Sequence, residues 1–188
     1  MEKAIKQRPS DCLKVVLFGP ESTGKTSLCE DLARHYGASC AREYMRLYLE
    51  AKLERGEGPI EKSDLLPIAF GQMACENKAA ESGKLVFCDT DLLQLKVYSQ
   101  YYYNGYCPKD IRDAALANTY HLYLLCDIDI PWEADPLRDR PFDRLTLFRI
   151  FKTELEKNNR PYQLISGGRQ HRLRQAVAVI DNLLQPTC

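Results

Sequence analysis

The chain has 188 residues, of which 45% are apolar and 28% are charged. This is the composition of one globular domain, and it excludes a disordered or collagen-like chain. The 26 basic residues balance the 26 acidic residues, so the net charge gives no reason to expect nucleic acid or a membrane surface as a partner. Without a long apolar run or a secretory signal, the chain is expected to be cytoplasmic.

Eight cysteines are present, and we expect them to be reduced and buried rather than joined in disulfides. Several of them lie inside apolar runs, and the chain is long enough to build its own hydrophobic core. No Cys-x-x-Cys pair occurs, which argues against a zinc site of the usual spacing.

Short β-rich runs alternate along the chain with longer amphipathic stretches. Residues 1–12 read as a polar tail, and strands are expected at 13–18, 39–42, 84–88, 120–126 and 162–165. Helices are expected at 24–36, 43–53, 63–82, 92–103 and 145–157, with a short one from Pro108 and a last one after Gly168. We expect Gly37 to end the first helix and Ser63 to cap the third.

This alternation predicts an α/β fold over residues 13–188, with a mostly parallel five-stranded sheet and helices on both faces. In such sheets, ligands bind at the carboxyl ends of the strands.

The first strand leads into Gly19-Pro-Glu-Ser-Thr-Gly24-Lys25-Thr26, which matches the phosphate-loop pattern G-x-x-x-x-G-K-[ST]. Glycines let the backbone wrap a phosphate chain with its N–H groups pointing inward. Lys25 is expected to reach the β- and γ-phosphates, and Thr26 to bind Mg²⁺. The predicted ATP site comprises Gly19, Glu21, Ser22, Thr23, Gly24, Lys25, Thr26 and Ser27. The motif alone does not separate a kinase from an ATPase or GTPase.

Acidic residues follow the third expected strand. Asp89 is the candidate second ligand of Mg²⁺, because an aspartate at a strand end beside a phosphate loop often holds that ion. Asp91 is a candidate for binding the acceptor substrate, and its alternative role is the N-cap of the helix that begins at Leu92.

Two further segments carry candidate acceptor-binding residues. Glu43 and Arg46 share a helix face, so they form either an acid–base pair in the acceptor pocket or a surface ion pair. Gly71 lies inside a long helix, which suggests close approach by a ligand or by a neighbouring helix. Gln72 beside it is then a candidate polar contact, with helix packing as the alternative.

Residues 129–144 are rich in proline, aspartate and arginine, and we interpret them as a lid. Arg138 is the best candidate to stabilise the transferring phosphoryl group, and an ion-paired, solvated loop is the alternative. Trp132 is the only tryptophan and is a candidate to stack on a flat substrate ring. After the last strand, Arg169 or Arg172 is a candidate to stack on adenine; both are alternatively solvated helix residues.

Five segments together resemble the ribosylnicotinamide kinase domain of the NadR type: G-P-E-S-T-G-K-T, R-E-Y-x-R, F-G-Q, C-D-T-D and P-W-E-x-D-x-x-R. The resemblance extends from about Leu13 to Leu184. It implies a three-layer P-loop kinase fold and MgATP-dependent phosphorylation of the 5′-hydroxyl of nicotinamide riboside. Because few residues precede the first strand, we expect a stand-alone form of this domain.

By this resemblance, the ribose lies among Glu43, Arg46 and Asp91, and the nicotinamide ring lies against Trp132. The remaining substrate-binding candidates are Tyr44, Gln72 and Asp135. Lys25 and Arg138 stabilise the transferred group, and either Glu43 or Asp89 positions and deprotonates the acceptor hydroxyl. The residues themselves do not decide between these two carboxylates.

The sequence therefore predicts a kinase that uses ATP and Mg²⁺, with a small nucleoside as its partner. A kinase for another nucleoside or metabolite is one alternative. Two others are an ATPase or nucleotide switch that acts through a protein partner, and a non-catalytic nucleotide-binding protein.

Overall fold

The computed structural model describes residues 5–81, 83–133 and 142–185. Five parallel strands form one sheet in the order β2-β3-β1-β4-β5. Their bounds are β1 Leu13–Phe18, β2 Ser39–Ala41, β3 Leu85–Asp89, β4 Leu122–Cys126 and β5 Tyr162–Ile165. Each lies within two residues of its predicted position, because short β-branched and aromatic runs between helices are a strong strand signal.

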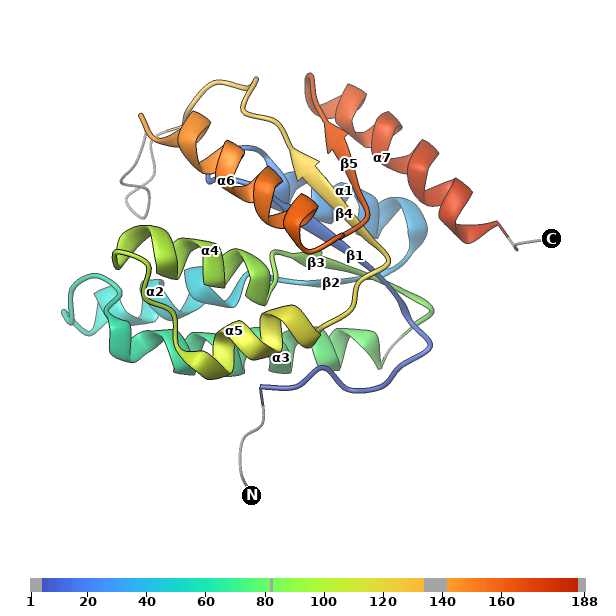
Figure 1. The fold of residues 1–188 in the computed structure, drawn as a ribbon. Coiled ribbons are helices and arrows are strands. Elements are labelled where there is room, and N and C mark those ends of the chain that lie inside the picture. The colour runs from blue at the N-terminus through green and yellow to red at the C-terminus, as the bar shows by residue number, and fades with distance from the viewer. Residues whose placement is uncertain (1–4, 82, 134–141, 186–188) are drawn as a thin grey trace.

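Helices cover both faces of the sheet (Figure 1). They are α1 Lys25–Tyr36, α2 Tyr44–Glu54, α3 Leu65–Ala80, α4 Leu92–Tyr102, α5 Lys109–Ala117, α6 Arg144–Lys157 and α7 Arg169–Leu184, with a 3-10 turn η1 at Lys62–Asp64. The predicted three-layer α/β fold is confirmed.

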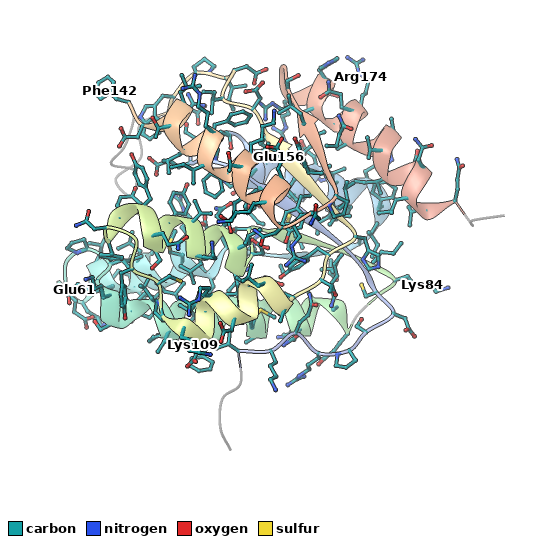
Figure 2. The ribbon with its side chains drawn as sticks, in the orientation of Figure 1. Glu61, Lys84, Lys109, Phe142, Glu156 and Arg174 are labelled. Atoms are coloured by element: carbon teal, nitrogen blue, oxygen red, sulfur yellow. A yellow bond between two sulfur atoms is a disulfide. The ribbon has the colours of Figure 1, made fainter. Side chains whose placement is uncertain are left out.

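The hydrophobic core is divided by the sheet, and side chains fill the space on each side of it (Figure 2). On one face, Val15 and Leu17 of β1 pack with residues of α1 and α7, including Leu32 and Ile180. On the other face, alternate β1 residues such as Phe18 pack with α3, α4, α5 and α6. Because β1 is central and buried on both faces, the loop that follows it starts from a rigid support.

The register of the sheet brings two predicted site segments together. Leu17 of β1 is paired with Asp89 of β3, so the end of β3 lies beside the start of the phosphate loop. Thr90 continues this contact, since its N–H donates to the Leu17 carbonyl oxygen at 3.2 Å. Thr90 has φ = 78°, which is a strained conformation for a β-branched residue and is typical of functional sites.

The start of the third helix differs from the prediction. Glu61, and not Ser63, caps η1: its side chain and that of Asp64 form a reciprocal capping box, and α3 follows directly. The end of the first helix is as expected, because Gly37 takes a left-handed conformation (φ = 61°) and its N–H donates to the carbonyl oxygen of Ala33.

The prediction that all cysteines are reduced is wrong for one pair. Cys29 of α1 and Cys40 of β2 form a disulfide with a Cα–Cα distance of 6.5 Å. The two residues are only 11 apart in sequence, but their meeting depends on how α1 packs on the sheet. Among the described residues, Cys12, Cys75, Cys88, Cys107 and Cys126 are unpaired.

The segment interpreted as a polar tail packs on the domain where the structure describes it. Ile5 and Cys12 are buried, and Gln7 exchanges hydrogen bonds with the backbone of Thr119. In the part of the chain that is described, no helix is long and apolar enough to cross a membrane.

Candidate active site

The phosphate loop needs glycine at two positions. Gly19 has φ = 133° and Gly24 has φ = 73°, both in the region that L side chains rarely adopt. A Cβ on Gly19 would also lie 3.0 Å from the carbonyl oxygen of Cys126 at the end of β4. These glycines allow the chain to turn closely over the sheet and to enter α1 at Lys25.

Hydrogen bonds within the loop fix its polar groups. The carbonyl oxygen of Pro20 accepts from Lys25 Nζ at 2.6 Å and from Thr23 Oγ1 at 2.8 Å. Ser22 adopts φ = 54°, which adds a second strained residue to the site. The Lys25 ammonium therefore lies over the loop, close to where the oxygens of a bound phosphate chain would lie.

Thr26 and Asp89 form the pair expected to hold Mg²⁺. Thr26 Oγ1 donates to Asp89 Oδ2 at 2.7 Å, and Asp89 Oδ1 is buried without a hydrogen-bond partner among the described residues. Burial raises the pKa of Asp89, while the Thr26 hydroxyl and the Lys25 ammonium oppose this shift. A hydroxyl and a carboxylate with an unused oxygen are ligands that suit Mg²⁺, so the residues fit this ion.

A cavity of about 720 Å³ opens beside the phosphate loop. Glu21 to Ser27 line one end, together with residues that follow β4 and Arg169 of α7. The other end lies among α2, the 58–60 segment and α4, and is lined mainly by apolar and aromatic side chains such as Leu49, Leu53, Ile60, Leu95, Tyr98 and Tyr102. We call these parts the nucleotide end and the acceptor end.

Glu43 and Arg46 also line this cavity. Glu43 lies close enough to Lys25 at the nucleotide end and to Tyr98 at the acceptor end for electrostatic interactions with both, which places it between the two ends. Glu43 precedes α2 in an extended conformation, and its side chain makes no capping hydrogen bond to that helix. Burial and the negative charge of Asp89 raise the pKa of Glu43 to about 7, against the opposing charge of Lys25. A carboxyl that titrates near neutral pH is suited to accept a proton from a substrate hydroxyl. Arg46 Nε donates to Glu50 at 3.1 Å.

Gln72 and Tyr44 do not line this cavity. Gln72 is buried, accepts a hydrogen bond from the Tyr44 backbone N–H at 3.0 Å and donates to Glu76 at 3.0 Å. A Cβ on Gly71 would lie 2.0 Å from the Tyr44 ring. The small residue in this helix thus makes room for a neighbouring helix, which was one of the two predicted explanations.

Asp91 is also absent from the wall of the main cavity, but with Gln72 it lines a small adjoining pocket that shares Glu43 with that cavity. Its Oδ1 accepts from the backbone N–H of Gln94 at 3.0 Å, and its Oδ2 accepts from Tyr123 Oη at 2.8 Å. The side chain is thus the N-cap of α4, the alternative to a substrate contact. Gln94 is a neighbour that sequence reasoning missed, since it lines the cavity and its Oε1 lies 3.4 Å from the backbone nitrogen of Gly19.

The predicted lid is described only at its two ends. Trp132 does not line the cavity, and the Arg144 guanidinium lies 5.9 Å from the centre of its ring. The Glu133 N–H donates to Ser22 Oγ at 2.9 Å, which ties the start of this segment to the phosphate loop. Arg138 and Asp135 lie outside the described residues.

Arg169 lies at the nucleotide end but is held by a partner. Its Nε and Nη2 donate to the two carboxylate oxygens of Asp31 at 2.6 and 2.7 Å, and this pairing lowers the pKa of Asp31. Arg172, which the sequence left as a candidate for adenine stacking or solvation, also lines this end of the cavity, but it is buried and donates to the carbonyl oxygen of Thr23. Sequence reasoning also missed Tyr98, although Tyr98 and Tyr102 are four residues apart on one helix face.

A family model and two curated relatives match this chain in sequence. A family model described as an AAA domain matches residues 14–172. The trifunctional NAD biosynthesis/regulator protein NadR of Escherichia coli (strain K12) is 31% identical over 150 residues, which is 77% of this chain and 36% of NadR. The protein of the same name from Salmonella typhimurium is 30% identical over the same length. The chain spans about a third of these curated relatives, and its resemblance to the NadR-type kinase domain is confirmed.

Solved structures share the fold. The crystal structure of a NadR protein in complex with NR matches with a TM-score of 0.74 at 21% identity, over 91% of this chain and 51% of that one. A NadR protein in complex with NAD and AMP-PNP gives 0.73 at 20% identity, over 94% and 51%. A deoxyadenosine kinase from M. mycoides gives 0.62 at 12% identity, over 91% and 100%.

Proposed function

The chain belongs to the AAA-domain family, and on this premise we propose that it is a kinase that transfers the γ-phosphoryl group of MgATP to the 5′-hydroxyl of nicotinamide riboside. The observation that carries the proposal is one cavity with two unlike ends, a phosphate loop at one and an aromatic wall at the other, with Glu43 between them. A nucleotide switch needs the first end only.

At the nucleotide end, Lys25 and the loop N–H groups bind the phosphate chain, and Thr26 and Asp89 hold Mg²⁺. The ion supplies charge stabilisation for the transferred group when it is bound. Glu43 and Asp89 differ in access to the acceptor, because Glu43 lines the cavity whereas Asp89 is buried and does not line it. We therefore assign to Glu43 the positioning and deprotonation of the hydroxyl.

At the acceptor end, the nicotinamide ring is assigned to Tyr98 and Tyr102. Nicotinamide riboside carries a cationic ring, and the face of an aromatic side chain attracts such a charge. This assignment replaces Trp132, which lies outside the cavity wall and beside a guanidinium that would repel a cation. A flat neutral base would also fit such a wall, so another nucleoside is the alternative acceptor.

The test is an assay of ADP formation with nicotinamide riboside, a panel of other nucleosides and no acceptor. We expect nicotinamide riboside to give ADP and nicotinamide mononucleotide in equal amounts, and the acceptor-free reaction to be slow. Turnover of another nucleoside but not of nicotinamide riboside would reject this substrate. Hydrolysis that no acceptor accelerates would instead favour an ATPase or switch.

A further inference from the structure

Arg172 lies in the first turn of α7, and its guanidinium joins three segments that are distant in the sequence. The residue is 3% exposed. Its Nε donates to the carbonyl oxygen of Gly167 at 2.7 Å, its Nη1 to that of Thr23 at 2.9 Å, and its Nη2 to that of Asp127 at 3.0 Å. One side chain therefore connects the turn before α7, the phosphate loop and the segment after β4.

The charge of Arg172 is balanced by Asp129. Arg172 Nη2 donates to Asp129 Oδ1, and Asp129 Oδ2 accepts from the backbone N–H of Gly167. Gly167 has φ = 84°, and a Cβ there would lie 2.8 Å from the His171 ring. Gly167 is thus held through both its N–H and its carbonyl group, which fixes the point from which Arg172 reaches the phosphate loop.

The contact with the Thr23 carbonyl determines how the Thr23–Gly24 peptide group is oriented. A trans peptide bond is planar, so the Gly24 N–H points away from the side on which the Thr23 carbonyl lies. Arg172 holds that carbonyl and thereby sets the direction of the Gly24 N–H. The preceding carbonyl, that of Ser22, accepts from Arg144 Nη2 at 2.9 Å in the same manner.

We propose that Arg172 is a positioning residue for the nucleotide: it keeps the Thr23–Gly24 peptide in the orientation that presents an N–H to the phosphates. The inference rests on the proposed function only in taking MgATP as the nucleotide. Arg172 lines the nucleotide end of the cavity, and four of its five N–H groups donate to carbonyl oxygens and to Asp129. We therefore assign its effect on the nucleotide to the backbone of the loop that it holds. It differs from both roles expected from the sequence, adenine stacking and solvation.

The test compares Arg172→Gln and Arg172→Lys with Arg174→Gln, an exposed control on the same helix (Figure 2). Calorimetric titration with MgATP, without acceptor, measures affinity, and thermal unfolding measures Tm. We expect Arg172→Gln to weaken MgATP binding about tenfold or more, because a buried charge-assisted contact is lost. Arg174→Gln should bind MgATP as the wild type does.

The lysine variant separates positioning from a merely structural role. Lysine keeps a charge for Asp129 but lacks the planar fork that reaches several carbonyls at once. We expect it to restore most of the Tm while MgATP affinity stays weakened. Affinity that recovers in step with Tm would overturn the proposal, and if Arg172→Gln does not fold, near wild-type binding by Arg172→Lys would do the same. A wild-type chain that binds no MgATP would remove the proposed function as well.

Discussion

The two ends of the cavity are built in different ways. At the nucleotide end, one contiguous segment, Glu21 to Leu28, supplies most of the lining, and its backbone is fixed by its own hydrogen bonds and by Arg144 and Arg172. The acceptor end is assembled from α2, the 58–60 segment and α4, and most of its wall is side chain. Backbone groups recognise what all nucleotides share, whereas side chains determine which acceptor fits.

Buried polar contacts hold the acceptor end in shape. Asp64 accepts hydrogen bonds from Tyr48 Oη at 2.8 Å, from Lys52 Nζ at 2.5 Å and from the Glu61 N–H at 2.7 Å. Tyr103 Oη donates to the carbonyl oxygen of Ile60 at 2.8 Å. This difference between the two ends predicts that substitutions at the nucleotide end stop transfer with any acceptor, whereas those at the acceptor end change which acceptor is used.

The largest effect is expected from Lys25→Ala. Loss of the ammonium removes a charge that stabilises the transferring group, so kcat should fall by at least about a hundredfold with every acceptor. The measurement is the rate of ADP formation, with Tm as the control for folding. Activity within a few-fold of the wild type would contradict the role given to the phosphate loop.

Glu43→Gln is expected to have the next largest effect. If Glu43 is the base, kcat should fall by about 10²-fold or more while the KM for ATP stays nearly constant. The corresponding amide substitution, Asp89→Asn, should instead raise the Mg²⁺ concentration needed for half-maximal activity. A Glu43→Gln variant with nearly full kcat would transfer the assignment to Asp89 or show that positioning alone suffices.

Tyr102→Leu tests the acceptor end. We expect the KM for nicotinamide riboside to rise up to about tenfold, because a cation–aromatic contact is lost, with little change in the KM for ATP. Trp132→Leu is the matched control, since Trp132 lies outside the cavity wall and should change the acceptor KM less. A larger effect at Trp132 would restore the assignment made from the sequence.

The last prediction concerns the stability of the fold and not the transfer reaction. Burial raises the pKa of Glu76 to about 8, despite hydrogen bonds from Tyr120 and Gln72. The folded chain therefore retains a proton that the unfolded chain releases, so the free energy of unfolding should fall as pH rises from 5 to 8. Glu76→Gln should make this decline shallower, by an amount on the order of 1 kcal/mol per pH unit at most.

Urea unfolding at several pH values measures this slope, and Glu81→Gln is the control because Glu81 is exposed. Burial also raises the pKa of Glu43 to about 7 and that of Asp91 to about 6, so part of the slope should persist in Glu76→Gln. An unchanged slope would mean that Glu76 loses its proton equally in both states.

Local patterns in the sequence predicted the strands, the helices and the phosphate loop, because each is determined by neighbouring residues. Residues whose role depends on distant partners were less predictable. The Cys29–Cys40 disulfide needs α1 and β2 to pack together, and the role of Arg172 needs three segments to converge. Gly71 was recognised as a point of close approach, but only the structure identifies Tyr44 as the neighbour.

Asp91 illustrates a different limit. A carboxylate just before an apolar helix has the same local pattern whether it binds a substrate or caps that helix. In the structure, Tyr123 of β4 donates to the second carboxylate oxygen of Asp91 at 2.8 Å, and the sequence around Asp91 does not reveal this contact. The acceptor end as a whole has this character, since Tyr98 and Tyr102 become a pocket wall only when α2 and the 58–60 segment lie opposite them.

The most direct test of the central claim is to follow the γ-phosphoryl group itself. Purified protein is incubated with γ-labelled MgATP and nicotinamide riboside, with Lys25→Ala as the control, and the labelled products are separated. The account predicts label in nicotinamide mononucleotide with the wild type and none with the variant. Label found only in inorganic phosphate, at a rate that nicotinamide riboside does not change, would contradict it.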